Sequence, residues 1–408
     1  FDIHFLTRFI LNSDNKLPEN PYLCGKLILM GMKKVFLFSI FLLCGLFFSQ
    51  ILPSALGSAY GTLASISKWL MFICLAFIMI NVGREFELDK AKWRSYTTDY
   101  FIAMATAAVP WLLIAGYYIF FLDTGLSWEN NLLISRFAAP TSAGILFTML
   151  AAAGLKKEWI YKKTQVLAIF DDLDTILLMI PLQILMIGFK WQLFVIIGVV
   201  CILLIFGWKR LSSLNLPQSW KSILLYSVCI VAAFESVYLI SKALMGQDGA
   251  IHIEVLLPAF VLGMVMKTVH NHSQEEERAS SFISYLFMFL VGLSTPIFIG
   301  LETGGDGMPG WGMLIFHVIV VTILSNLGKM FPLFFYRDRK IQERLALSIG
   351  MFTRGEVGAG IIVIAMGYQL GGSALIISIL SLVLNLVLTG FFVVAVKRIS
   401  QSVYGVKE

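Results

Sequence analysis

Charged residues are scarce in this chain, and the charge that is present is not gathered in one place. Only 14% of its 408 residues are Asp, Glu, Lys or Arg, whereas about a quarter are charged in an ordinary soluble domain. Outside the first thirty residues there is no long polar block that could form a separate soluble domain. The net charge is +6, but the basic residues lie at the ends of apolar runs, so no nucleic-acid partner is expected.

Cysteine is also sparse and carries no recognisable pattern. The five cysteines are Cys24, Cys44, Cys74, Cys201 and Cys229. Four of them lie in apolar segments, and no CxxC or paired spacing occurs, which favours packing over a disulfide or a metal site. No cofactor is expected.

Apolar residues dominate what remains, at 58% of the chain. Stretches of about 20 apolar residues are long enough to cross a bilayer core of about 30 Å. Because no barrel-like alternation occurs and lipid cannot satisfy an open backbone, the spans must be helices. The sequence predicts an all-α polytopic membrane protein with about twelve transmembrane helices. The predicted cores are 35–53, 63–82, 98–121, 131–154, 161–188, 191–207, 221–243, 250–266, 281–301, 310–335, 343–368 and 372–396.

The distribution of Lys and Arg predicts the orientation of these spans. With the N-terminus inside, the cytoplasmic segments carry 25 of the 31 basic residues, whereas the external segments hold only Lys68, Lys190 and Lys242. That asymmetry follows the positive-inside rule. We expect a multi-pass protein of the inner (plasma) membrane with both termini in the cytoplasm.

The first 33 residues stand apart from the predicted transmembrane domain, 34–408. The segment MKKVFLFSIFLLCGLFFS, which starts at Met32, resembles a translation start with a basic region and an apolar core. Residues 1–33 are therefore interpreted as an N-terminal extension without an assigned function, and the first helix as retained.

Two of the predicted spans contain residues that interrupt a helix. The fourth holds SRFAAPTSAG (135–144), and the eleventh holds SIGMFTRGEVGAG (348–360). Pro140 removes a backbone donor, and the glycines permit irregular backbone. Interrupted spans in matching places of two halves are typical of inverted-repeat transporters, whose half-helix ends meet at a midplane site. An ordinary kink is the alternative for either span taken alone.

Three carboxylates lie within the fifth span, in LAIFDDLDTILLMI. Asp171 is about ten residues into the helix, or about 15 Å, which places it near the bilayer midplane. A charge at that depth is expected to be functional. Asp171 and Asp172 point in different directions on a helix, while Asp174 shares the stripe of Asp171.

Basic partners for these acids occur in two later spans. Lys329 can reach Asp171 from the tenth span, and snorkelling to the headgroups is the alternative. Arg354 and Glu356 lie at the second helix interruption, where we expect them to neutralise each other. Five further residues in or near spans are not assigned as ligands: Arg136, Glu235, His252, Glu254 and His317.

Four motifs in this order resemble the monovalent cation/proton antiporters, namely APTSAG, FDDLD, NLGKMF and TRGEVGAG. The segment NVGREFELDKAKW (81–93) fits as well, and the resemblance covers the chain from about residue 35. It implies a core domain (helices of about 98–188 and 310–396) that contains two crossing broken helices. It also implies a dimerisation or scaffold domain (about 34–82 and 191–301) and a homodimer.

The resemblance also implies roles for individual residues. Asp172 is implied as the main carrier of the alkali cation and of protons, and Asp171 as the partner of Lys329. Thr141 is implied as the helix-break threonine that joins them at the site. Pro140, Ser142, Arg354 and Glu356 are expected, from their places in the two interrupted spans, to be supporting residues at the breaks. A double aspartate with a lysine resembles the electrogenic branch, which exchanges more protons than cations. We expect no nucleotide-binding domain of the Kef type.

Two departures and two alternative functions stay open. Arg136 and Pro140 are unusual beside the threonine motif, and Asp174 is an additional acid that could change cation preference or stoichiometry. A sodium-coupled solute symporter or a channel would share the architecture. A membrane prenyltransferase would need a second acidic cluster, which the sequence lacks. The favoured function is exchange of Na⁺ or Li⁺, or K⁺, for protons by alternating access.

Overall fold

The regular structure of this chain is helical. The computed structural model describes residues 21–84, 93–122, 125–142, 146, 150, 155, 158–178, 182, 191–210, 212–245, 255–267, 274–296, 310–368 and 370–404. Within these residues the only pairing of strand type is one isolated bridge between Leu214 and Met266. The all-α fold class is therefore confirmed.

The helices follow the predicted spans in order. They are α2 (Pro21–Leu56), η1 (Gly57–Ala59), α3 (Tyr60–Arg84), α4 (Trp93–Phe121), α5 (Trp128–Ser135), η3 (Arg136–Ala138), α7 (Trp159–Leu177), α9 (Trp191–Lys209), α10 (Trp220–Met245), α11 (Leu256–Val265), α12 (Gln274–Leu293), α13 (Trp311–Gly328), η5 (Phe331–Phe334), α14 (Ile341–Gly350), α15 (Glu356–Gly367) and α16 (Gly372–Tyr404). Each of the twelve predicted ranges overlaps at least one of these helices.

Five stretches in the described residues are long and apolar enough to cross a membrane by length and composition. They are Phe36–Arg84, Tyr96–Phe121, Trp220–Ser241, Trp311–Phe334 and Gly372–Ser400. The protein is thus an integral, multi-pass membrane protein, and the total of twelve spans stays a prediction. Residues 1–20 of the predicted extension, most of 143–154 and most of 179–190 lie outside the described residues.

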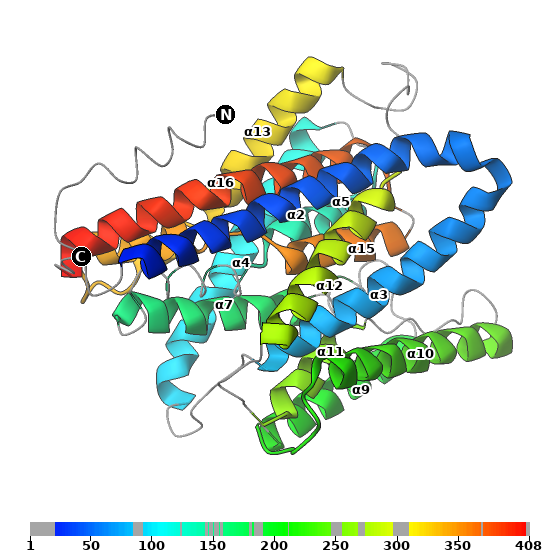
Figure 1. Ribbon diagram of the computed structural model, residues 1–408, viewed down its shortest axis with the longest axis horizontal. Helices are drawn as coiled ribbons and strands as arrows, with labels where there is room; N and C mark the ends of the chain where they lie inside the picture. The colour runs from blue at the N-terminus through cyan, green and yellow to red at the C-terminus, as the bar shows by residue number, and fades with distance from the viewer. Residues whose placement is uncertain are drawn as a thin grey trace.

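One group of helices consists of α2, α3, α10, α11 and α12. Figure 1 shows α2 and α3 as two long blue helices joined by η1, with α9 and α10 below α3. Helix α2 packs along α12, and α3 packs along α11. Both contacts depend on glycine, because a Cβ on Gly292 would overlap the Leu42 carbonyl and a Cβ on Gly263 would overlap the Ile80 carbonyl. Small residues of this kind let membrane helices approach backbone to backbone.

A second group consists of α4, α5, α7, α13, α14, α15 and α16. Polar side chains join its long helices. The Thr322 and Ser381 hydroxyls lie 2.9 Å apart, and the Asn326 side-chain amide donates to Asn385 Oδ1 at 3.0 Å, so both pairs tie α13 to α16. Interhelical hydrogen bonds of this kind stabilise helix association in lipid. The two groups meet where α15 packs on α3 and α12, and where α16 packs on α2.

The tenth span departs from its prediction of one continuous helix over 310–335. Helix α13 ends at Gly328, and the short η5 helix follows with Pro332 in its first turn. Because Pro332 has no N–H, it cannot donate to the carbonyl of Gly328 four residues earlier. Lys329 is therefore the C-cap residue of α13 and does not lie in a helix interior.

Candidate functional site

Both predicted interruptions are present, and the two broken segments cross. After α5 and η3 the chain runs without helix through Ala139–Ser142. The eleventh span divides into α14 and α15, with a non-helical stretch between Gly350 and Glu356. The Ser142 N–H donates to the Thr353 carbonyl at 2.9 Å, so the two interruptions are hydrogen-bonded to each other.

The local sequence accounts for this crossing. Pro140 has no N–H and cannot continue the preceding helix. In the first turn of α15, a Cβ on Gly358 would lie 2.9 Å from the Phe137 carbonyl oxygen, which is closer than real Cβ contacts allow. A glycine at this position therefore permits the close approach of the second segment to the first.

Asp171 lies at the crossing and is completely buried. Its Oδ2 atom accepts a hydrogen bond from the Thr141 hydroxyl at 2.6 Å and lies 2.6 Å from Lys329 Nζ. The first broken segment, helix α7 and the end of α13 thus meet at one carboxylate oxygen. The Oδ1 atom of Asp171 has no hydrogen-bond partner among the described residues.

Lys329 is also completely buried, which excludes the snorkelling alternative. Besides Asp171, its ammonium group donates to the Ala139 carbonyl. That carbonyl was freed by the interruption of the fourth span, so the lysine satisfies a backbone group that has no helical partner.

Arg354 satisfies the next freed carbonyl, and its partners correct one expectation. Its guanidinium donates to the Pro140 carbonyl at 3.2 Å and to Ser325 Oγ at 2.7 Å. No ion pair within 4 Å joins Arg354 to Glu356, both of which the structure describes, so the expected mutual neutralisation is wrong. Glu356 instead accepts a long hydrogen bond, 3.5 Å, from the Ser142 hydroxyl. The physical reason is that carbonyls exposed by Pro140 need donors, and Arg354 is the donor within reach.

The other two aspartates of α7 are as buried as the first, at 1% exposure each. Asp174 approaches the Tyr100 hydroxyl on α4. No group of three or more His, Cys, Asp or Glu side chains in the described residues could hold a metal ion. The arrangement does not resemble a divalent-metal site with several carboxylate ligands.

The fixed charges of this region nearly balance. Four carboxylates, on Asp171, Asp172, Asp174 and Glu356, lie with three cations, on Arg136, Lys329 and Arg354. With every group ionised, one negative charge is in excess. One monovalent cation or one proton would cancel it, and both are small enough to enter a closely packed interior.

Arg136 is the residue that the sequence analysis left unassigned and that the structure places against the site. It is completely buried and contacts α7. A charge inside a predicted span is a signal that could have identified it. Of the other unassigned residues, His317 is hydrogen-bonded to the Tyr117 hydroxyl at 2.6 Å, and His252 and Glu254 lie outside the described residues.

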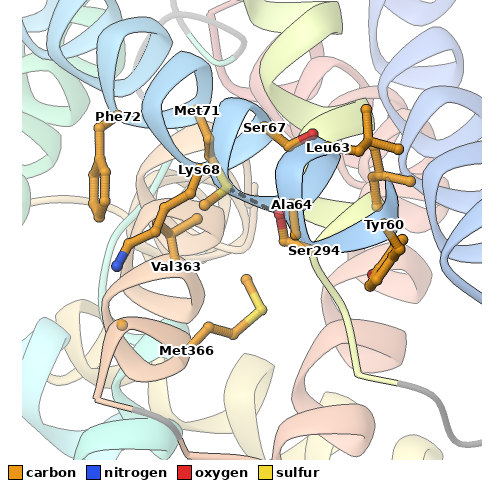
Figure 2. Close-up of a pocket in the computed structure, with 12 residues that line it drawn as sticks. Tyr60, Leu63, Ala64, Ser67, Lys68, Met71, Phe72, Ser294, Val363 and Met366 are labelled. Carbon is orange, nitrogen blue, oxygen red and sulfur yellow. Dashed lines mark hydrogen bonds between the residues drawn. The ribbon is translucent and has the colours of Figure 1, made fainter. Parts of the chain in front are cut away.

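A separate cavity of about 200 Å³ lies away from the acids. Its walls come from the first half of α3, the end of α12 and the second half of α15. Figure 2 shows Lys68, Ser67 and Met366 among the side chains that line it. Three residues beyond the last lining residue of α3, Leu75 packs against Gly360 of α15, since a Cβ on Gly360 would lie 2.8 Å from a Leu75 methyl group. An apolar contact thus lies between the cavity and the start of α15.

The two helix interruptions thus cross at the buried pair of Asp171 and Lys329. The family described as sodium/hydrogen exchanger, transmembrane, matches residues 21–398. The chain belongs to this sodium/hydrogen exchanger family. The resemblance drawn from the four motifs is confirmed. The family is one of transporters, so the enzyme alternative is excluded.

A solved structure of an antiporter shares the fold of this exchanger. The sodium proton antiporter MjNhaP1 from Methanocaldococcus jannaschii, determined at pH 8, is 12% identical, with a TM-score of 0.55. The match covers 90% of this chain and 98% of that one. An electron microscopy map of the same antiporter matches with a TM-score of 0.45, 12% identity and 82% coverage of each chain. No curated protein matches.

Proposed function

We propose that this protein exchanges Na⁺ for protons across the membrane, and that the acids of α7 carry both ions by competition. The observation that carries this proposal is the meeting of Asp171, Thr141 and Lys329 at the crossing of the two interrupted segments. Family membership supports exchange of sodium and protons. The structural relative, MjNhaP1, is a sodium proton antiporter.

The donor set suits a hard monovalent cation. Carboxylate and hydroxyl oxygens are the ligands that such cations prefer. Asp172 is the proposed main carrier, with Thr141 and the Oδ1 atom of Asp171 as the neighbouring oxygens. The Ala139 and Pro140 carbonyls, which the first interruption frees from helical hydrogen bonds, are bound to Lys329 and Arg354. They become available only if these cations move.

Competition follows from the excess of one negative charge. One cation or one proton neutralises this excess charge, so the two ions compete for the site. A second proton can enter only if Asp171 leaves Lys329. With two protons bound, the site would then carry one net positive charge. With one cation bound, it would carry no net charge. The proposed exchange is therefore electrogenic, with two protons for one cation.

The proposed movement is alternating access. The second helix group, about 98–188 and 310–396, acts as the moving core, and the first group, about 34–82 and 191–301, acts as the scaffold and dimer contact. The cavity beside Lys68 lies between the two groups, at the end predicted to face outward. We propose that it is the closed outer entrance. Li⁺ and K⁺ are candidate alternative cations.

The test uses purified protein in vesicles with an internal pH dye. Addition of Na⁺ to vesicles with an acidic interior should make the interior more alkaline as protons leave. An unchanged pH on addition of Na⁺, Li⁺ or K⁺ would contradict the proposal. Movement of cations without protons would favour the symporter or channel. A cross-linking assay in native membranes tests the proposed homodimer.

A further inference from the structure

We propose that Arg136 is a positioning residue that fixes the first helix interruption so that Thr141 and the Ala139 carbonyl are held at Asp171 and Lys329. The inference rests on the proposed exchange and assigns a role to a residue that the family motifs do not include. Arg136 opens the η3 helix and is completely buried. Its guanidinium stays charged at any physiological pH, so its partners must hold a permanent cation.

Those partners are backbone carbonyls at the end of α7. Arg136 Nε and Nη2 donate to the Thr175 carbonyl at 3.1 and 2.6 Å, and Nη2 also donates to the Asp174 carbonyl at 3.1 Å. Helix α7 ends at Leu177, so these carbonyls belong to its last turn. The last carbonyls of a helix lack helical donors and form the negative end of its dipole. Arg136 supplies the positive charge there, and its donors add to the Leu178 N–H, which donates to the Asp174 carbonyl at 2.9 Å.

A third helix holds the guanidinium from another direction. The central carbon of the Arg136 guanidinium lies 4.7 Å from the centre of the Trp111 ring on α4. Trp111 Nε1 in turn donates to the Leu132 carbonyl of α5 at 2.7 Å. A cation over an indole face is attracted by the ring. The side chain of Arg136 therefore has one position, defined by α4, α5 and α7 together.

The interrupted segment is consequently attached to α7 at two levels. Arg136 binds the end of α7, and five residues later the Thr141 hydroxyl binds Asp171, one helical turn before Thr175. Between these attachments lies the Ala139 carbonyl that accepts from Lys329. A non-helical segment has no hydrogen bonds of its own to set its path. The two attachments fix it on the α7 side, while the Ser142–Thr353 and Arg354–Pro140 hydrogen bonds fix it on the side of the second interruption. Only one of the two attachments to α7 belongs to the proposed ion site.

Lysine cannot replace arginine in this arrangement. The planar guanidinium reaches two successive carbonyls and stacks on the indole, whereas an ammonium group is a point charge with three rotatable donors. Arg136→Lys keeps the positive charge but loses the planar set of N–H donors that reaches two carbonyls. It therefore separates a requirement for geometry from a requirement for charge.

The experiment measures Na⁺-dependent proton movement in vesicles over a range of Na⁺ concentrations. Arg136→Lys is expected to raise the KM for Na⁺ by on the order of tenfold, as for the loss of one hydrogen bond of a charged group, with Vmax changed much less. Thr141→Ala should raise the KM as well. Because Arg136 acts in part through the position of Thr141, the double variant should raise the KM by less than the product of the single increases. Arg84→Lys is the matched control, since Arg84 also makes two side-chain hydrogen bonds, but in α3. Its KM should equal that of the wild type.

Two results would overturn the inference. One is an unchanged KM in Arg136→Lys, and the other is a double variant whose KM increase is the product of the single increases. A purely structural role predicts less folded protein with an unaltered KM. If Arg136→Lys does not fold, Trp111→Leu takes its place, and an unchanged KM there overturns the inference too. If the wild type itself moves no protons with Na⁺, the proposed function fails instead.

Discussion

Lys329 Nζ lies 2.6 Å from Asp171 Oδ2, and both side chains are completely buried at the point where the two interrupted segments cross. An ammonium and a carboxylate removed from water each lose hydration that their mutual attraction only partly restores. Such a pair is weak evidence for stability by itself. Its position, with Thr141 on the same oxygen, supports the proposed role, in which Asp171 is ion-paired in one state and takes a proton in another.

Removing one member of this pair should destabilise the protein more than removing both. Lys329→Gln leaves a buried carboxylate without its cation, which costs about 3–5 kcal/mol. Lys329→Gln combined with Asp171→Asn should regain most of that loss. Thermal unfolding in detergent measures both. The exposed pair of Arg339 and Asp338 is the control, where Arg339→Gln should cost less than about 1 kcal/mol. Equal losses in the single and double variants would contradict the account.

The glycine contacts of the scaffold should not tolerate a methyl group. A Cβ on Gly292 would overlap the backbone of α2, whereas one on Gly61 would meet nothing within 4 Å. Gly292→Ala should therefore lower the free energy of unfolding by about 1–3 kcal/mol, as in other overpacked interiors, and Gly61→Ala should change it little. Thermal unfolding of the two variants side by side is the measurement. A Gly292→Ala variant as stable as the wild type would show that α2 and α12 can separate.

The cavity beside Lys68 should be accessible from one side of the membrane while deeper positions are closed. In a chain freed of its native cysteines, Ser294→Cys should react with a membrane-impermeant thiol reagent added outside. Ala359→Cys, completely buried near the Leu75–Gly360 contact, should not react at rest. Its reaction should rise during turnover with Na⁺, when the contact opens. Constant protection of Ala359→Cys during turnover would contradict the proposed outer entrance.

A contact at the start of α7 predicts a dependence of stability on alkaline pH. Lys163 Nζ lies 2.8 Å from Asp99 Oδ2, and the Tyr336 hydroxyl donates to Asp99 Oδ1 at 2.8 Å. Burial, and then the Asp99 carboxylate, raise the pKa of Tyr336 above its ordinary value, so the folded state favours the protonated hydroxyl. The stabilisation that comes from the protonated Tyr336 hydroxyl is fully present below pH 10, the ordinary pKa of tyrosine. It is lost as the pH rises further.

Tyr336→Phe should therefore cost about 1 kcal/mol at pH 8, the usual value of one hydrogen bond. The difference from the wild type should shrink above pH 10, because the wild type then loses stability that the variant never had. Unfolding curves at pH 8 and pH 11 measure this difference. A gap that grows with pH would contradict the assignment of Tyr336 as the donor.

The sequence was sufficient for the elements whose cause is local or set by lipid. Apolar length gave the order of the helices, and Pro140 with the glycines of 348–360 gave both interruptions. The length of the lysine side chain suggested that Lys329 could reach Asp171. Each of these follows from one segment and the depth of a residue in the bilayer.

What the sequence could not provide depends on donors and acceptors that meet across the fold. An ion pair of Arg354 with Glu356 was expected because the two residues are close in the chain. The Arg354 guanidinium instead donates to the freed Pro140 carbonyl. Arg136 was assigned no role, because its partners are backbone carbonyls of α7 and every residue has a backbone carbonyl. The end of α13 at Gly328 was missed, although Pro332 in the sequence could have indicated it.

The carrier assignment is tested by one conservative substitution. Asp172→Asn keeps the size of the side chain and removes its charge, so exchange should fall to the level of empty vesicles. Asp338→Asn alters an acid that is 72% exposed and remote from the crossing, and should exchange like the wild type. Full exchange by Asp172→Asn would move the carrier role to another acid, with Asp174 as the nearest candidate.

The most direct measurement of the central claim is proton movement driven by Na⁺ in vesicles, recorded with the membrane potential clamped at zero and with it set to an imposed value. Competition for a site with one excess negative charge predicts that Na⁺ moves protons in the opposite direction, and that the imposed potential changes the rate. Sodium uptake that leaves the internal pH unchanged at both potentials would contradict the account.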